Sequence, residues 1–212
     1  MDKPKGEIKV PIKISTSNSK LGVIPSVNLP PVVTCRKDAP CVKDCYARKG
    51  RFRFRTVIDS MDLNYALYQS YPETYFKEIK KFLNNGFISY SYFRWHAAGD
   101  IVDSNYFEGM VKVAEELPHT SFLAFTKKFE IVNEYIDNGG KIPENLNIVF
   151  SAWGADFKVN NPYSFPVSHV RFKDPVRNTG IPSNAAECSG TCSECLHCWT
   201  IKHGESVVFN AH

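Results

Sequence analysis

The seven cysteines of this 212-residue chain stand in two tight groups, with none between them. Thiolates that are two or three residues apart can all turn inward from one short loop, and a four-iron cluster needs such a ring of sulfurs around it. The distribution therefore predicts an iron–sulfur cluster. The first group is Cys35, Cys41 and Cys45, and the second is Cys188, Cys192, Cys195 and Cys198.

Disulfides and zinc are the two other uses of such cysteines. An odd count leaves one thiol over, and the opening MDKPKGEIKV has no apolar run of the secretory kind, so we expect the reducing cytosol, where disulfides are rare. Zinc would take four cysteines, or cysteines with His197 or His203. Zinc sites usually combine two separated pairs, whereas Cys188-x3-Cys192-x2-Cys195-x2-Cys198 is one run with the ferredoxin spacing read backwards. The spacing favours iron and sulfide.

The cysteines admit two arrangements, and both stay open at this point. In the first, Cys35, Cys41 and Cys45 hold a cluster with one open iron, while the four C-terminal cysteines hold a closed cluster. In the second, both ends of the chain contribute to one cluster, and the remaining thiols are structural. The expected cofactor is thus one or two clusters of the 4Fe–4S or 3Fe–4S type, at least one of which uses the C-terminal run.

Charge and hydropathy limit the other classes of function. The 26 basic and 22 acidic residues give a mild positive balance, which does not by itself indicate a nucleic-acid-binding protein. No apolar run approaches the roughly 20 residues that a membrane span needs. Basic and aromatic residues do interleave over Arg48–Arg55, beside the first cysteine group. This segment can bind phosphates and stack on bases, or it is a solvated edge whose Phe52 and Phe54 point into the core.

Helices and strands alternate along the chain, because the period of the apolar residues switches repeatedly between about 3.6 and two. Pro72 suits a first helical turn, Gly86 suits a left-handed cap, and Asp103 can cap the helix that follows it. The predicted helices are 59–71, 73–84, 104–116 and 129–137, and the predicted strands are 87–95, 121–126, 147–153 and 168–172.

This alternation predicts one α/β domain over residues 1–212, with a mostly parallel sheet, helices on its outside and a cysteine-rich C-terminal loop. A complete eight-fold barrel usually takes about 250 residues, so we expect an incomplete TIM-like barrel or an open, curved sheet. The ligand site of such folds lies beyond the carboxyl ends of the strands. That rule selects His96, Gly99 and Asp100 after one strand, Thr126, Lys127 and Lys128 after the next, and Ser151, Trp153 and Asp156 after the third.

Three of these residues are candidates for catalysis. An open iron can polarise a carbonyl and lower the pKa of bound water, as other Lewis-acid metals do. His96 and Asp100 would then move the proton, and Lys127 would hold an anionic substrate. Each also has a structural interpretation: His96 as a hydrogen-bonded core residue, Asp100 as a cap of the turn that Gly99 allows, and Lys127 as a solvated side chain.

Five motifs along the chain are Asn18-Ser19-Lys20-Leu21, Cys35-x5-Cys41-x3-Cys45-Tyr46-Ala47, Arg94-Trp95-His96-Ala97-Ala98-Gly99-Asp100, Phe125-Thr126-Lys127 and Cys195-x2-Cys198-Trp199. Through these motifs the chain resembles the phage gene product 88 family from about residue 18 to the C-terminus. The resemblance implies a viral iron–sulfur protein that acts in the cytoplasm of a bacterial host. The chain is more distantly similar to radical S-adenosylmethionine enzymes, in which a Cys-Tyr-Ala step closes a cluster loop after the first strand of a partial barrel.

The first cysteine group departs from the radical enzymes, which space their cluster cysteines as C-x3-C-x2-C. A strand end of the Gly-Gly-Glu-Pro kind, which binds the methionyl amine of S-adenosylmethionine, is also missing. We therefore expect a metalloenzyme with hydrolytic or lyase-type chemistry on a small molecule, and take a divergent S-adenosylmethionine-dependent enzyme as the second hypothesis. Electron transfer, and nucleic-acid binding around a structural cluster, are the alternatives outside enzymology. Oligomeric state is left open.

Overall fold

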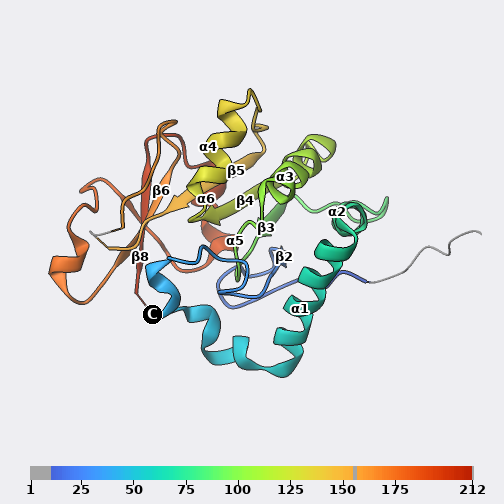
Figure 1. Ribbon diagram of the computed structural model, residues 1–212, viewed down its shortest axis with the longest axis horizontal. Helices are drawn as coiled ribbons and strands as arrows, with labels where there is room; N and C mark the ends of the chain where they lie inside the picture. The colour runs from blue at the N-terminus through green and yellow to red at the C-terminus, as the bar shows by residue number, and fades with distance from the viewer. Residues whose placement is uncertain (1–10, 155–156, 212) are drawn as a thin grey trace, which may run out of the picture.

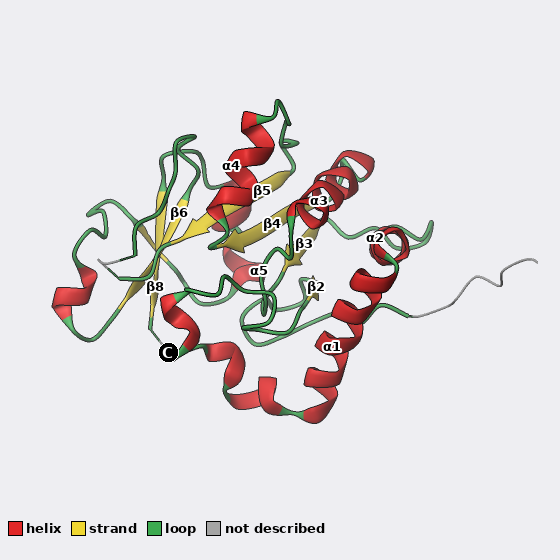
Figure 2. Cartoon of the chain, viewed as in Figure 1, coloured by secondary structure: helices red, strands yellow, loops and turns green. Residues whose placement is uncertain are grey.

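An eight-stranded open sheet runs through the molecule, for which the computed structural model describes residues 11–154 and 157–211 (Figures 1 and 2). The strand order is β1-β2-β3-β4-β5-β6-β8-β7, and every neighbouring pair is parallel except β1 with β2. The strands are β1 (Ile14–Ser15), β2 (Ser26–Val27), β3 (Tyr92–Trp95), β4 (Ser121–Thr126), β5 (Leu146–Ser151), β6 (Val167–Arg171), β7 (Ala186–Glu187) and β8 (Ser206–Asn210).

The four long helices lie along one side of this sheet (Figure 1). Parallel strands that follow one another in chain order need crossovers of one hand, which bring each helix back to the same face. Two short helices, α5 (Cys192–Cys195) and α6 (His197–Thr200), lie between β7 and β8 in the chain. The long helices are α1 (Arg55–Ser70), α2 (Pro72–Leu83), α3 (Ser104–Glu116) and α4 (Phe129–Asp137).

Alternate residues of β3 and β4 pack on opposite faces of the sheet. Phe93 and Trp95 of β3 pack among the helices in the larger core, whereas Tyr92 of the same strand packs against the second apolar cluster. On β4 the same alternation sends Phe122 to the helices and Leu123 to the other side. Burying side chains of this size contributes about 1.5–3 kcal/mol each. The second face, which we call the cavity face, is therefore free to build a site.

Several predicted elements are confirmed to the residue. The helices predicted at 104–116 and 129–137 are α3 and α4, and the strand at 121–126 is β4. The Asp103 carboxylate accepts a hydrogen bond from the Tyr106 amide at 2.8 Å, as a capping residue does. Pro72 occupies the first turn of α2. The predicted open, mostly parallel α/β sheet is confirmed, while barrel-like curvature and a single domain stay predictions.

Other boundaries are wrong. The strand predicted at 87–95 begins only at Tyr92, because Asn85 Oδ1 accepts hydrogen bonds from the amides of Phe87 and Ile88 and folds this stretch into a turn. Phe87 is 98% exposed. The second helix ends at Leu83, so Gly86 lies in that turn and does not cap it. Within 11–154 and 157–211, no helix has the length and apolar character to cross a bilayer.

Candidate functional site

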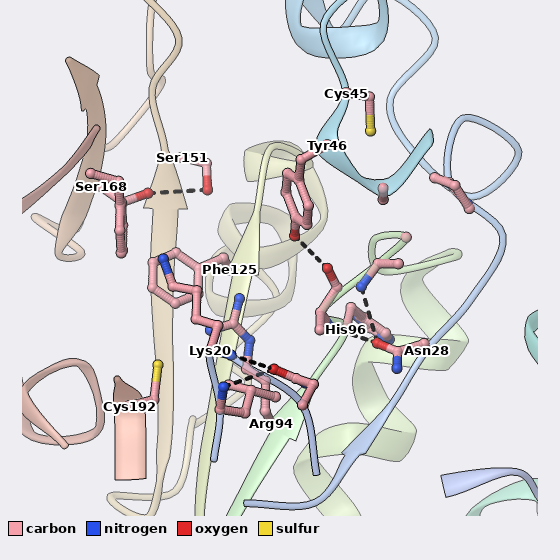
Figure 3. A pocket seen from close by; sticks show the side chains of 18 of the residues that line it. Lys20, Asn28, Cys45, Tyr46, Arg94, His96, Phe125, Ser151, Ser168 and Cys192 are labelled. Carbon is pink, nitrogen blue, oxygen red and sulfur yellow. Dashed lines mark hydrogen bonds between the residues drawn. The ribbon is translucent and has the colours of Figure 1, made fainter. Parts of the chain in front are cut away.

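A cavity of about 1440 Å³ opens on the cavity face, and all seven cysteines line it. Its floor contains side chains from successive parallel strands, among them Arg94 of β3, Phe125 of β4 and Ser151 of β5. Figure 3 looks into this cavity, with Cys45 and Cys192 on opposite sides of the view. The two cysteine groups, far apart in the sequence, thus converge on one space.

The first cysteine group lies in the loop between β2 and α1, above the carboxyl ends of the strands. Hydrogen bonds hold this loop in place. The Tyr46 hydroxyl donates to the Ala97 carbonyl oxygen, just after β3 (Figure 3). The Asn28 side-chain oxygen accepts from the amides of Ala97 and Ala98 at 2.8 and 3.0 Å. The loop and the end of β3 are therefore one structural unit.

The second cysteine group is held against the cavity face by polar anchors. Asn147 of β5 donates its amide hydrogens to the carbonyl oxygens of Cys198 and Ile201, both at 3.0 Å. The Trp199 indole donates to the Phe93 carbonyl oxygen at 3.3 Å. The Cys192 amide donates to the Lys20 carbonyl oxygen at 2.8 Å, so the segment before β2 also supports this group.

The seven thiols are candidate ligands of a metal cluster. None of the seven is in a disulfide. Burial, Asp100 and the neighbours Cys41 and Cys45 raise the pKa of Cys35 to about 11. A bound metal reverses this, since a coordinating thiol is deprotonated outright. In the described part of the chain, no three Cys, His, Asp or Glu side chains surround a single ion, but a cluster spreads its thiolates further apart than an ion does.

The electrostatic neighbours of each thiol include cysteines of its own group. Cys35 has Cys41 and Cys45 as its thiol neighbours, all in the first group. Burial raises the pKa of Cys198 to about 12, with further contributions from the other three C-terminal cysteines. The thiol neighbours of Cys35 and Cys198 thus belong to their own groups, and the choice between two clusters and one shared cluster stays a prediction.

His96 lies at the carboxyl end of β3 and is 3% exposed. Its Nε2 is 2.9 Å from the Tyr106 hydroxyl, its Nδ1 has no hydrogen-bond partner among the described residues, and its φ of 56° is left-handed. Burial, then Arg94 and Lys128, lower its pKa to about 3. The imidazole is therefore neutral near pH 7. A general base needs a pKa near the working pH, and the pKa of His96 is well below it. Its catalytic role stays a prediction, and its contacts fit the hydrogen-bonded core interpretation.

This buried imidazole predicts a pH dependence of stability. The unfolded chain protonates His96 near pH 6.5 and the folded chain near pH 3. Between these values the unfolded state binds one more proton, so stability is present above pH 6.5 and falls as the pH drops, by up to about 1.4 kcal/mol per pH unit. In urea unfolding between pH 7 and pH 4, the free energy of unfolding of His96→Gln should depend less steeply on pH than that of the wild type. His119→Gln, on the surface, should keep the wild-type slope. Equal slopes for wild type and His96→Gln would contradict the prediction.

Asp100 joins the ends of two strands. Its Oδ1 accepts from the Thr126 hydroxyl at 2.7 Å and the Ile101 amide at 2.8 Å, and its Oδ2 accepts from the Lys127 amide at 3.0 Å. Burial raises its pKa, and these hydrogen bonds oppose the shift. Asp100 lines the cavity and is an electrostatic neighbour of Cys35. It therefore positions the strand ends beneath the first cysteine group, and proton transfer by it stays a prediction.

The remaining predicted residues divide into two sets. Lys127 lines the cavity with its ammonium 5.7 Å from the centre of the Trp153 ring, and Ser151 lies beside Ser168, whose hydroxyls are 3.2 Å apart (Figure 3). The Lys128 ammonium instead donates to the Val102 carbonyl oxygen at 2.7 Å. Asp156 is outside the described residues.

The Arg48–Arg55 segment forms two 3-10 turns, Tyr46–Arg48 and Gly50–Arg53, and the first residue of α1. Its arginines and Lys49 are exposed. Phe52 packs edge-on against Tyr46, with ring centres 5.9 Å apart, so its predicted inward orientation is confirmed. Phe54 is 60% exposed, and the same prediction for it is wrong.

Two cavity residues were missed as candidates from the sequence. Arg94 lies mid-strand on β3, with its guanidinium 4.1 Å from the centre of the Phe125 ring. Lys20 lies in the segment before β2, with its ammonium 4.3 Å from the centre of the Phe209 ring. Figure 3 shows both directed into the same region of the cavity. The rule that selects strand ends passes over residues of the floor, and the alternation of Arg94 with Phe93 and Trp95 was the signal for its orientation.

Comparison with known proteins gives a family and no activity. The family model for gene product 88 matches residues 6–201, which include every cysteine. No curated protein and no solved structure matches the chain. Because the family match covers nearly the whole sequence, the chain belongs to the gene product 88 family.

Proposed function

We propose that this protein is an iron–sulfur enzyme of phage origin, acting in the cytoplasm of the bacterial host on a small anionic molecule. The observation that carries the proposal is the convergence of seven unpaired thiols, in two groups, on one cavity. Four cysteines within one short segment have few structural uses, and a buried free cysteine is normally an isolated one. The C-terminal group would hold a closed cluster, and Cys35, Cys41 and Cys45 a cluster with an accessible iron.

Such a cluster, when bound, supplies a Lewis-acidic iron that polarises a carbonyl and lowers the pKa of bound water, the basis of hydrolytic or lyase-type chemistry. The chain's own residues would orient the substrate beneath it. Asp100 holds the ends of β3 and β4 in register through Thr126 and the Lys127 amide. This leaves the Lys127 ammonium over Trp153 at the cavity wall, available to an anionic group.

Anaerobic purification tests the proposal directly. The purified chain is expected to be brown, to absorb broadly in the visible region, and to contain iron and acid-labile sulfide in equal amounts. Protein that is colourless and free of iron when made without oxygen overturns the proposal, and stoichiometric zinc in its place assigns the thiols to a zinc site.

S-adenosylmethionine-dependent chemistry is the second candidate, and one observation favours it. The first cysteine loop directly follows β2, the first of the parallel strands, and Tyr46 and Ala47 follow Cys45. The reduced protein would then cleave S-adenosylmethionine, which is measured by the release of methionine. If neither that cofactor nor simple esters and thioesters are cleaved by protein with an intact cluster, both versions of the enzyme lose their support.

Nucleic-acid binding through Arg48–Arg55 is favoured by the exposure of its basic side chains and of Phe54. For this function, the double variant Lys49→Ala with Arg53→Ala should weaken binding to a single-stranded oligonucleotide. The slope of log K against the logarithm of the salt concentration should become shallower by about 0.7 per lost phosphate contact. Fluorescence anisotropy at several salt concentrations measures both, with Lys141→Ala, after α4, as the matched control. Identical curves for the two variants exclude this segment as the binding surface.

A further inference from the structure

Four basic side chains that line the cavity are each held over an aromatic ring. Lys20 lies over Phe209, Arg94 over Phe125, Lys127 over Trp153 and Arg177 over Phe172, with 4.3, 4.1, 5.7 and 3.6 Å from the charged group to the ring centre. Contacts of this kind orient a cation without neutralising it. In the described part of the chain, none of the four is in a salt bridge.

Arg94 and Lys20 form the inner part of this set. Their partner rings, Phe125 and Phe209, pack edge to face with centres 5.7 Å apart, so the two cations flank one aromatic pair. The Arg94 Nε donates to the Trp95 carbonyl oxygen at 3.1 Å, and no other hydrogen bond of this guanidinium occurs among the described residues. Its two terminal nitrogens therefore remain available on the floor of the cavity.

The carboxylates of the cavity form no salt bridge with these four cations among the described residues. Four carboxylates line the cavity, Asp44, Asp100, Asp174 and Glu187. Glu187 is paired with Arg171 at 2.6 Å, Asp100 accepts from the Thr126 hydroxyl and the Lys127 amide, and Asp174 accepts from the Val176 amide at 3.0 Å. Seven Lys and Arg side chains line the cavity against these four carboxylates, so its lining has an excess of positive charge. Lys20 and Arg94 are half-buried and have no carboxylate in a salt bridge with them in the part of the chain that the structure describes, so a ligand that brings negative charge lowers the cost of burying them.

We propose that Arg94 and Lys20 form a binding subsite for an oxyanion group of the substrate, a phosphate or a carboxylate. The planar fork of the guanidinium matches two oxygens of either group, and the ammonium adds a point charge beside it. The subsite rests on the proposed function only in assigning this anion to the substrate. It deepens that function by naming the substrate class, a small molecule with an anionic end that lies on the sheet and a reacting end toward the first cysteine group.

Inorganic phosphate and acetate are the probes that test this subsite. The anaerobically purified full chain is unfolded thermally while either anion replaces chloride at constant ionic strength, and the concentration dependence of the midpoint gives its dissociation constant. We expect saturable stabilisation of the wild type by at least one of the two. Phosphate alone or acetate alone identifies which group the substrate has.

Arg94→Gln and Lys20→Gln should each raise the dissociation constant about tenfold, the effect of losing a charge-assisted hydrogen bond. Arg94→Lys keeps the charge without the fork and should fall between Arg94→Gln and wild type. Lys112→Gln, exposed on α3 and outside the cavity, should match wild type. If Arg94→Gln does not fold, Lys20→Gln decides the question alone.

Two results overturn the subsite. In one, neither anion stabilises the wild type, or the cavity variants bind it as tightly as Lys112→Gln does. In the other, Arg94→Gln loses iron or changes the visible spectrum while its anion affinity is unchanged, which assigns Arg94 to the charge balance of the thiols, since it is an electrostatic neighbour of Cys192 and Cys198. Iron and sulfide counts on the same samples report the proposed function separately, so the two failures are distinguishable.

Discussion

Replacing Cys35, Cys41 and Cys45 together with alanine is expected to remove one of the two proposed clusters and leave the other in place. The first group lies above the strand ends and the second is anchored by Asn147 on the cavity face, so neither group needs the other to keep its shape. If both clusters contain four irons, the variant retains about half of the iron and sulfide. Iron and sulfide counts after anaerobic purification make the measurement.

The reciprocal variant replaces the four C-terminal cysteines and should keep the complementary share. Ser189→Ala is the matched control, because Ser189 lines the same cavity between Cys188 and Cys192 and its change leaves every thiol in place. Loss of all iron from both cysteine variants would establish the other arrangement, a single cluster shared by the two groups. Unchanged iron in the first variant would exclude Cys35, Cys41 and Cys45 as ligands.

Gly99→Ala is expected to destabilise the fold strongly. Gly99 has a φ of 87°, and an added Cβ would lie 2.8 Å from both the Leu29 carbonyl oxygen and Thr34 Oγ1. The left-handed backbone costs about 1–2 kcal/mol for a residue with a Cβ. Overpacking against the loop adds about 1–3 kcal/mol. The free energy of unfolding, measured with urea, should therefore fall by about 2–5 kcal/mol.

Gly139→Ala separates these two contributions. Gly139 has nearly the same backbone, with a φ of 83°, but an added Cβ there has no heavy atom within 4 Å. This variant should lose only the backbone part, about 1–2 kcal/mol. Equal losses for the two variants would mean that the loop yields to the new methyl group, and that its tight packing against the end of β3 does not stabilise the fold.

The central layers were predictable because their residues follow one period over many positions. Helices α3 and α4 and strand β4 each carry a regular apolar pattern and clear end signals, such as Asp103. The sheet edges were not predictable, since β1, β2 and β7 have two residues each and exist only through pairing with a neighbour. Strand β8, with Val207, Val208 and Phe209, did have the apolar β-branched signal and was overlooked.

The thiols of the site could be predicted from the sequence, whereas the role of its cationic side chains could not. Spacing alone selected the cysteines, and the strand-end rule selected Asp100 and Lys127, which do line the same cavity. The exposure of Phe54 was missed because a basic segment with alternating rings has the period of a strand, whereas 3-10 turns shape it here. The significance of Arg94 depends on Phe125 and on distant carboxylates that bond elsewhere, and no local pattern reports such relations.

The segment before β2 meets the second cysteine group in a way that bears on folding order. The Lys20 carbonyl oxygen accepts from the Cys192 amide, and an added Cβ at Gly22 would lie 2.0 Å from Ser193 Oγ. Contacts between segments so distant in the chain close a long loop and form late. We therefore expect strands β2 to β6 and the helices between them to assemble first, since β7 and β8 flank the second cysteine group in the chain. If the thiols hold clusters, as proposed, docking of the C-terminal segment would follow and would enclose the metal.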